Sequence, residues 1–232
     1  MLRVEDLSVA YGSVKALEGV TLEIARQGAL HGIIGPNGAG KSTLMDAITG
    51  RRKPTRGRVF VDGRDITNHS VARRRRLGMS RSFQRTSIFP CVSVGEQLEL
   101  VASQLGESDL TGIVEILDLG RVYGEIADNI AYGDQRRVDI ALALVGRPSL
   151  MLLDEPAAGL STTETLALFE HLAAIVRERN VTALVVEHDI DAVFRFCDTI
   201  TALDLGRLLA TGAPAEVRKD PRVIAAYLGT AA

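Results

Sequence analysis

The first part of the chain carries the alternating pattern of β-strands. Residues 2–9 and 20–24 alternate or run apolar, with a turn at residues 11–13 between them. A further strand at residues 57–61 precedes Asp-Gly and a second short run at residues 64–66, which predicts a hairpin with a type I′ turn. These segments together predict a β-rich N-terminal region.

The remainder of the chain alternates short apolar runs with helical patterns. The runs predict buried strands, at residues 29–34, 150–153, 181–186 and 199–203. Helical patterns follow three of them, at residues 41–48, after a capping box at residues 161–164, and at residues 189–196. Strand–helix alternation of this kind is typical of a mostly parallel sheet with helices on its faces.

The middle of the chain differs from both neighbouring regions. From residue 94 to about residue 143 the pattern is mostly helical, with expected breaks at Gly106, Gly112 and Gly120, and a C-terminal helix is expected after Gly206. The middle segment therefore reads as an inserted helical subdomain. We place it at about residues 85–145, with residues 1–84 and 146–232 forming the core and the β subdomain.

Composition adds limits to this picture. The chain has 232 residues, 22 glycines, no tryptophan and 4% aromatic residues, so its core must be aliphatic. Lys and Arg total 27 and Asp and Glu 29, a formal charge of −2, which disfavours a dedicated nucleic-acid-binding domain. No secretory signal is expected, and the longest apolar runs fall well short of the ~20 residues that cross a bilayer.

For the two cysteines and for a run of basic residues, we favour interpretations that involve no functional site. Cys91 and Cys197 lie far apart without metal-type spacing, and we expect free thiols in a reducing compartment. The basic run at residues 73–76, with Arg81 and Arg85, could bind the phosphates of lipid or nucleic acid. A solvated helix face is the favoured interpretation.

A glycine-rich segment between a predicted strand and a predicted helix matches G-x-x-x-x-G-K-[ST]. Its residues are Gly35, Pro36, Asn37, Gly38, Ala39, Gly40, Lys41, Ser42 and Thr43. The glycines allow successive N–H groups to surround phosphate oxygens, and the helix N-terminus adds partial positive charge. Lys41 supplies a full charge at the β/γ-phosphates and the Ser42 hydroxyl a Mg²⁺ ligand. The segment predicts a P-loop that binds ATP and Mg²⁺.

The apolar strand at residues 150–153 ends in two carboxylates. Asp154 is suited to hold Mg²⁺, directly or through water, and Glu155 to polarise the water that attacks the γ-phosphate. An ordinary solvated strand end is the alternative, and it loses weight because the P-loop precedes it.

These motifs, with residues 130–137 between them, resemble the ATP-binding subunit of an ABC transporter over the whole chain. The resemblance implies a P-loop NTPase fold of ABC type: a mostly parallel core sheet, an N-terminal antiparallel β subdomain and an inserted α-helical subdomain. It implies that Tyr11 stacks on adenine and that Gln84 contacts Mg²⁺ and the attacking water. It also implies that His188 contacts the γ-phosphate. From the residues alone, Tyr11, Gln84 and His188 would each read as structural or solvated.

The resemblance assigns the signature motif to residues 130–134. Ala131, Tyr132, Gly133 and Asp134 would act on the ATP held by a second ATPase subunit. Ala131 stands where serine is common, and Asp134 where glutamine is common. A carboxylate near phosphate is unfavourable unless it points away or meets a basic neighbour such as Arg136 or Arg137. Ser161 stands where aspartate is common in the loop towards the opposite subunit, and it can equally be the cap of its helix.

The signature, residues 155–160 and 187–189, and the tail at residues 220–229 are similar to the ATPases of branched-chain amino acid importers. The expected partners are transmembrane permease subunits, a second ATPase subunit (self or paralogue) and, indirectly, a solute-binding protein, with no nucleic acid. The expected location is cytoplasmic, peripheral at the inner face of the membrane. Alternatives are the ATPase of a urea or aromatic-acid importer, an exporter, a non-transport ABC ATPase, or a module that traps nucleotide without turnover.

Overall fold

The computed structural model describes residues 1–82, 86–107 and 109–228, and it begins with an antiparallel sheet. Its strands lie in the order β2-β1-β4-β5. Their bounds are β1 (Leu2–Tyr11), β2 (Val14–Ile24), β4 (Arg56–Val61) and β5 (Arg64–Asp65). Asp62 and Gly63 have φ of 50° and 75°, and positive φ at both central residues confirms the predicted type I′ turn.

A second, six-stranded sheet forms the centre of the molecule, in the order β10-β9-β3-β8-β7-β6. Its strands are β3 (Leu30–Ile34), β6 (Met79–Ser82), β7 (Leu150–Asp154), β8 (Thr182–Val186), β9 (Thr199–Asp204) and β10 (Arg207–Gly212). All neighbours pair in parallel except β9 and β10. The mostly parallel core sheet expected from the sequence is confirmed.

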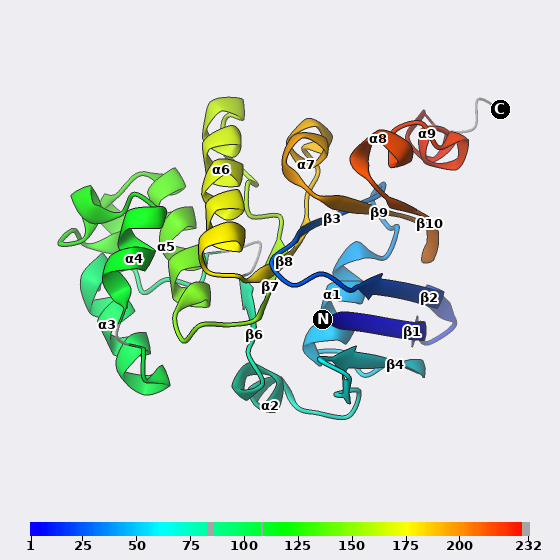
Figure 1. The fold of residues 1–232 in the computed structure, drawn as a ribbon, viewed down its shortest axis with the longest axis horizontal. Coiled ribbons are helices and arrows are strands. Elements are labelled where there is room, and N and C mark those ends of the chain that lie inside the picture. The colour runs from blue at the N-terminus through cyan, green and yellow to red at the C-terminus, as the bar shows by residue number, and fades with distance from the viewer. Residues whose placement is uncertain (83–85, 108, 229–232) are drawn as a thin grey trace.

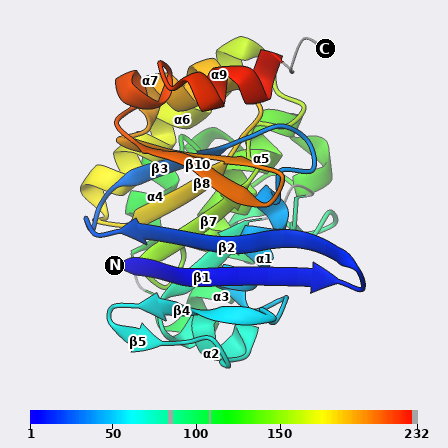
Figure 2. The same cartoon turned by 90° about the vertical axis from the view of Figure 1, so that its right-hand side faces the viewer.

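Helix α1 (Lys41–Thr49) lies between the two sheets (Figure 2). Because side chains alternate along a strand, each central strand contributes to two cores. Ile33 and Leu152 pack with α1 and the antiparallel sheet, whereas Ile34 and Leu153 pack on the opposite face. The end of β3 is thus held in place by a hydrophobic core on each face of the sheet.

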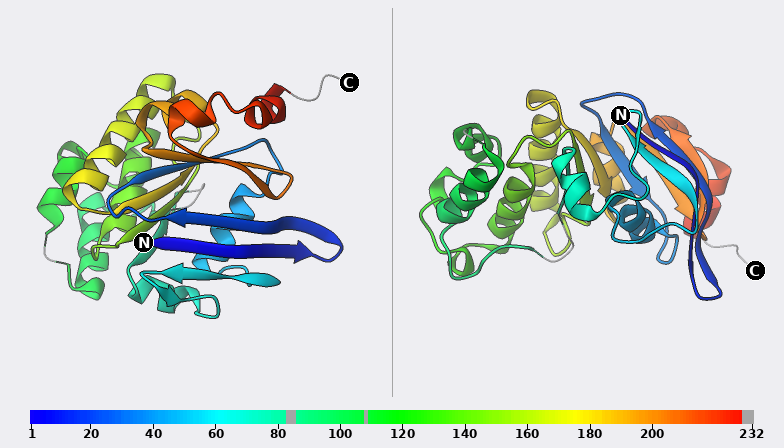
Figure 3. Two further views of the ribbon diagram at one scale, coloured as in Figure 1. Left: turned by 45° about the vertical axis from the view of Figure 1, so that its right-hand side comes forward. Right: turned by 90° about the horizontal axis from the view of Figure 1, so that it is seen from below.

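The opposite face of the central sheet is covered by α6 (Thr162–Glu178) and α7 (Ile190–Phe196) (Figure 1). The helical middle of the chain lies at one end of the molecule and the antiparallel sheet towards the other (Figure 3). Its main helices are α3 (Val94–Leu105), α4 (Leu110–Ile116) and α5 (Tyr132–Leu144), with short 3₁₀ turns at Gly120–Val122 and Ala127–Asn129. Helices α8 (Pro214–Val217) and α9 (Pro221–Leu228) follow β10. None of the helices in the described residues combines the length and the apolar composition that crossing a bilayer requires.

Three local expectations differ from the structure. Gly112 does not break a helix, because its N–H lies in the first turn of α4 and is accepted by the side chain of the N-cap residue Asp109. The sequence pattern does not predict strands β6 and β10, because β6 carries no apolar run and the run in β10 is only three residues long. Gly106, in contrast, ends α3 with φ of 69°, as expected of a glycine cap.

The basic run is not a uniformly solvated helix face. It lies in α2 (Val71–Arg76), where the side chain of Arg74 is only 1% exposed. The Arg74 guanidinium donates to the carbonyls of Ala47 at 2.9 Å and Ile48 at the end of α1, and to those of Thr67 and His69. Burial lowers the pKa of Arg74 to about 10. A cation at the C-terminus of a helix binds carbonyls that the helix itself leaves unpaired.

Candidate functional site

The glycine-rich loop at residues 35–40 connects β3 to α1. Gly38 and Gly40 have φ of 82° and 99°, a region that favours glycine. A Cβ at Gly40 would lie 2.7 Å from the carbonyl oxygen of Ala16, so the loop also needs glycine there for space. Ala39 N–H closes a turn onto Pro36 O at 3.1 Å. The chain thereby enters α1 with its first N–H groups turned into the loop.

Lys41 is the first residue of α1, and its side chain is turned back over the loop. Its Nζ donates to Gly35 O at 2.6 Å and to Pro36 O at 3.1 Å, and the residue is 6% exposed. Burial lowers the pKa of Lys41, while the charges of Glu155 and Asp154 oppose that shift. The ammonium is therefore held beside the loop and two carboxylates.

A cavity of about 340 Å³ opens over this loop. Its walls are Ala16, Asn37, Gly38, Ala39, Gly40, Lys41, Ser42, Thr43, Glu155 and His188. Residues from three strand ends, widely separated along the chain, thus meet at one site. The N-terminus of α1 and the ammonium of Lys41 favour an anion in this cavity.

Glu155 follows β7 and has a φ of 50°, which is uncommon for a residue other than glycine. Its Oε1 lies 2.8 Å from Nε2 of His188, which follows β8. Its own N–H is fixed by Val186 O at 2.9 Å. A backbone held in this sparsely populated conformation turns the side chain of Glu155 to the cavity wall beside His188.

Glu187 is a buried carboxylate beside the site, and it is not among the candidate site residues predicted from the sequence. It is 4% exposed, and its two carboxylate oxygens accept from Ala157 N–H at 2.6 Å and His188 N–H at 3.0 Å. Burial raises the pKa of Glu187, and the two N–H donors oppose that shift. The Glu187 carboxylate therefore joins the segment that follows Glu155 to His188, whose ring is hydrogen-bonded to Glu155. The signal that could have found it is a Glu at the end of an otherwise apolar strand.

Asp154 is 8% exposed at the end of β7. Its Oδ2 accepts from a guanidinium nitrogen of Arg81 at 2.6 Å. The side chain of Arg81, a member of the basic set for which the sequence favours a solvated face, is only 9% exposed. The expectation of a solvated arginine is wrong here, because β6 runs beside β7 and directs Arg81 to the carboxylate.

The oxygen donors near the cavity suit Mg²⁺. The hydroxyl of Ser42 follows Lys41 in the first turn of α1, and Asp154 supplies a carboxylate at the end of β7, two strands from β3 in the central sheet. Magnesium is typically bound by one or two such protein groups, with phosphates and water completing the coordination. Gln84, the third expected ligand, lies outside the described residues.

Tyr11 does not line the cavity. It ends β1 with 43% exposure, and the guanidinium of Arg52 lies 4.2 Å from the centre of its ring. Arg52 also donates to Ala10 O at 2.9 Å, so the arginine is held in place over that ring. One face of Tyr11 is covered by a cation.

The signature segment forms the N-terminus of α5. Asp134 is buried and accepts from Arg121 at 2.6 Å and from Arg137. Of the two basic neighbours considered from the sequence, Arg137 bonds the carboxylate, whereas Arg136 lies 5.2 Å from the ring centre of Tyr132. Tyr132 donates to Ala158 O at 3.2 Å, which joins the signature to the loop after Glu155.

Ser161 caps α6. Its hydroxyl accepts from Glu164 N–H, and the Glu164 carboxylate accepts in turn from Ser161 N–H at 2.9 Å. The capping box expected from the sequence is confirmed.

The fold and the loop define a class of protein that binds nucleotide. The family described as ABC transporter matches residues 17–158, more than half of the chain. The chain belongs to the ABC transporter family, as an ATP-binding and ATP-hydrolysing cassette.

Similar proteins indicate which group within the ABC transporter family the chain resembles. A family described as branched-chain amino acid ATP-binding cassette transporter matches residues 207–232. The chain is 36% identical to the high-affinity branched-chain amino acid transport ATP-binding protein LivG of Salmonella typhimurium, covering 100% of this chain and 98% of that protein. It is equally similar to BraF of Pseudomonas aeruginosa, which carries the same description, with 36% identity and the same coverage.

Solved structures agree with the fold. An ATP-binding cassette of an ABC transporter in its ADP conformation superposes with a TM-score of 0.88 at 32% identity, covering 99% of this chain and 98% of that one. A nucleotide-free cassette of an ABC transporter gives a TM-score of 0.88 at 30% identity, with 99% of each chain covered. The ABC ATPase fold expected from the sequence is confirmed.

Proposed function

We propose that this chain hydrolyses ATP at the cavity over residues 35–43 to energise the import of branched-chain amino acids or a related small solute. The full-length similarity to proteins described as branched-chain amino acid transport ATP-binding proteins supports the solute class. The match of residues 207–232 to the corresponding C-terminal family supports it independently of the nucleotide site.

In this proposal the loop and Lys41 bind the phosphates. The N–H groups around Gly38 and Gly40 surround the β-phosphate, and Lys41 exchanges its two carbonyl acceptors for phosphate oxygens. Ser42, Asp154 and Gln84 would hold Mg²⁺, which when bound neutralises charge on the β- and γ-phosphates. Tyr11 would stack on adenine with the ring face that Arg52 does not cover.

The observation that carries the proposal is the 2.8 Å bond between Glu155 and His188 at the cavity wall. Glu155 accepts a hydrogen bond from water and orients it in line with the γ-phosphate. His188 orients the Glu155 carboxylate and donates to the γ-phosphate when its ring turns towards it. Glu187 keeps both residues in place by binding the N–H groups of Ala157 and His188.

A second subunit completes the site in this proposal, either another copy or a paralogue. Solved dimeric cassettes of the family share 26% identity with this chain at TM-scores of 0.78 and 0.79. Residues 131–134 would face the ATP held by the other subunit. Because Arg121 and Arg137 bind the carboxylate of Asp134, the signature can approach phosphate without an unpaired negative charge.

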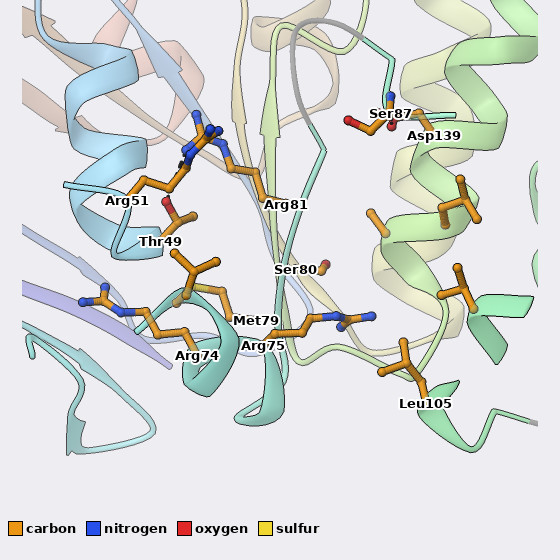
Figure 4. A pocket seen from close by; sticks show the side chains of 14 residues that line it. Thr49, Arg51, Arg74, Arg75, Met79, Ser80, Arg81, Ser87, Leu105 and Asp139 are labelled. Atoms are coloured by element: carbon orange, nitrogen blue, oxygen red, sulfur yellow. Dashed lines mark hydrogen bonds between the residues drawn. The ribbon is translucent and has the colours of Figure 1, made fainter. Parts of the chain in front are cut away.

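A groove of about 320 Å³ between the central sheet and the helical middle supports docking of a transmembrane partner. We call it the subdomain groove. It is lined by Thr49, Arg51, Val71, Arg74, Arg75, Met79, Ser80, Arg81, Ser87, Val101, Leu105, Asp139, Leu142 and Ala143 (Figure 4). Its apolar walls and basic rim suit a short helix from a permease subunit, and Phe89, 54% exposed, lies just after Ser87 in sequence. The chain would then be peripheral at the inner face of the membrane.

The test is transport by a strain that lacks this chain. Uptake of labelled leucine should return with the wild-type chain and should not return with Glu155→Gln, a substitution that changes the charge of the side chain and hardly its size. Recovery of urea uptake, or of uptake of an aromatic acid, without leucine uptake would contradict the solute class. Recovery by Glu155→Gln would contradict the role of Glu155.

A further inference from the structure

Arg81 bridges two parts of the site that otherwise lie on different elements. It extends from β6, the strand at one edge of the central sheet, towards α1 (Figure 4). One guanidinium nitrogen donates to Asp154 at 2.6 Å. The other donates to Asp46 at 2.6 Å and to the Thr49 hydroxyl at 3.2 Å, both on α1.

This bridge differs from a surface ion pair because its side chains are largely buried. The side chains of Arg81 and Asp154 are only 9% and 11% exposed, and that of Asp46 is 33% exposed. A planar guanidinium that holds two carboxylates with separate nitrogens fixes the orientation of both, which a lysine cannot do. One oxygen of the Asp154 carboxylate is thereby held in a defined direction relative to α1, the helix that carries Lys41 and Ser42.

We propose that Arg81 is a positioning residue for the divalent cation: it orients the Asp154 carboxylate by anchoring it to Asp46. This rests on the proposed role of Asp154 in binding Mg²⁺. Partners of a metal-binding carboxylate contribute to metal affinity although they do not touch the metal. Because Arg81 also lines the subdomain groove, the cation site and the groove share one side chain.

The experiment measures Mn²⁺, a paramagnetic substitute for Mg²⁺, binding to the chain in the presence of ADP by electron paramagnetic resonance. Arg81→Lys keeps the charge but loses the fork, and the Mn²⁺ concentration at half-saturation should rise about tenfold, the low end for loss of a partner of this kind. The matched control is Arg75→Lys, which lines the same groove but donates to Val145 O instead. It should leave Mn²⁺ binding unchanged.

Asp46→Asn provides a second, independent reading. It removes the anchor of Arg81 without touching Asp154 and should weaken Mn²⁺ binding by about threefold in the wild-type background. In the Arg81→Lys background the same substitution should have a clearly smaller effect, because the bridge is already lost. Equal effects in both backgrounds would overturn the proposed bridge.

The outcomes separate this inference from the proposed function. If the wild-type chain with ADP binds no Mn²⁺, the proposed cation site fails. If it binds Mn²⁺ and Arg81→Lys binds it equally well, only the role of Arg81 fails. Binding of a fluorescent ATP analogue in EDTA should be the same for wild type and Arg81→Lys. Loss of that binding would assign Arg81 to the fold or the nucleotide site rather than to the cation.

Discussion

The loop over Lys41 and the signature segment at the start of α5 both present a helix N-terminus, yet they treat charge differently. In the loop, glycine N–H groups and one buried ammonium surround the space, and the ammonium is held by carbonyls. In the signature, a buried carboxylate, Asp134, is bound by Arg121 and Arg137. The first is an anion site built within one chain. The second is a helix start whose buried carboxylate is neutralised, and in the proposed function it acts on the ATP of another subunit.

The largest expected effect concerns ATP hydrolysis, which we assign to the cavity over the Lys41 loop and not to the signature segment of the same chain. Glu155→Gln should lower ATP turnover by about 100-fold or more, the contribution of a positioned base, while nucleotide binding is kept. Steady-state phosphate release and binding of a fluorescent ATP analogue measure the two quantities. Glu170→Gln, an exposed position on α6, is the control and should retain wild-type turnover.

Next in size is the loss of the ammonium. Lys41→Ala removes a charged donor to the phosphates, so nucleotide affinity should fall about 30-fold, within the range for a hydrogen bond to a charged group. Isothermal titration with ATP measures this in the isolated chain. The exposed Lys53 gives the matched control, Lys53→Ala, and an affinity equal to that of the wild type in both variants would contradict the role of Lys41.

A smaller effect is expected in the signature. Asp134→Asn leaves two guanidinium groups without their shared charge and should lower the free energy of unfolding by about 2 kcal/mol. Nucleotide affinity of the isolated chain should not change, because Asp134 does not line the cavity over the loop. Urea unfolding and the same titration give both values. A drop in nucleotide affinity would show that the two regions are not independent within one chain.

The smallest effect concerns Ser161, beside the signature. As a helix cap alone, Ser161→Ala should cost about 1 kcal/mol of stability and leave basal turnover unchanged. Ser93 forms the same capping box at the start of α3 and serves as the control. An equal loss for both serines fits a cap, whereas a loss of turnover specific to Ser161 would assign it a role towards the second subunit.

The sequence predicted what depends on neighbouring residues. The P-loop match, the glycine cap after Leu105, the Asp-Gly turn and the capping box at Ser161 are local, since short spacings and φ preferences determine them. The alternation of apolar runs with helices predicted the central sheet, because buried parallel strands carry continuous apolar residues.

What the sequence could not predict depends on residues far apart in the chain. Arg74 and Arg81 sit among basic residues that resemble a solvated face, and only the tertiary fold brings a helix end and two carboxylates to them. Strand β6 forms because it pairs with β7, and its own composition gives no sign of this. For the same reason Asp134 could be matched with Arg137, three residues away, but not with Arg121.

Helix α1 has one end in the nucleotide cavity and the other in the wall of the subdomain groove. Lys41 begins the helix, while Thr49, its last residue, lines the groove. Nine residues of α-helix span only about 13 Å and do not bend appreciably over that length. The guanidinium of Arg74 donates to two carbonyls near the far end of α1, those of Ala47 and Ile48, and so ties that end to α2. A displacement of the helix at the groove would therefore also displace Lys41, so the two sites share one structural element.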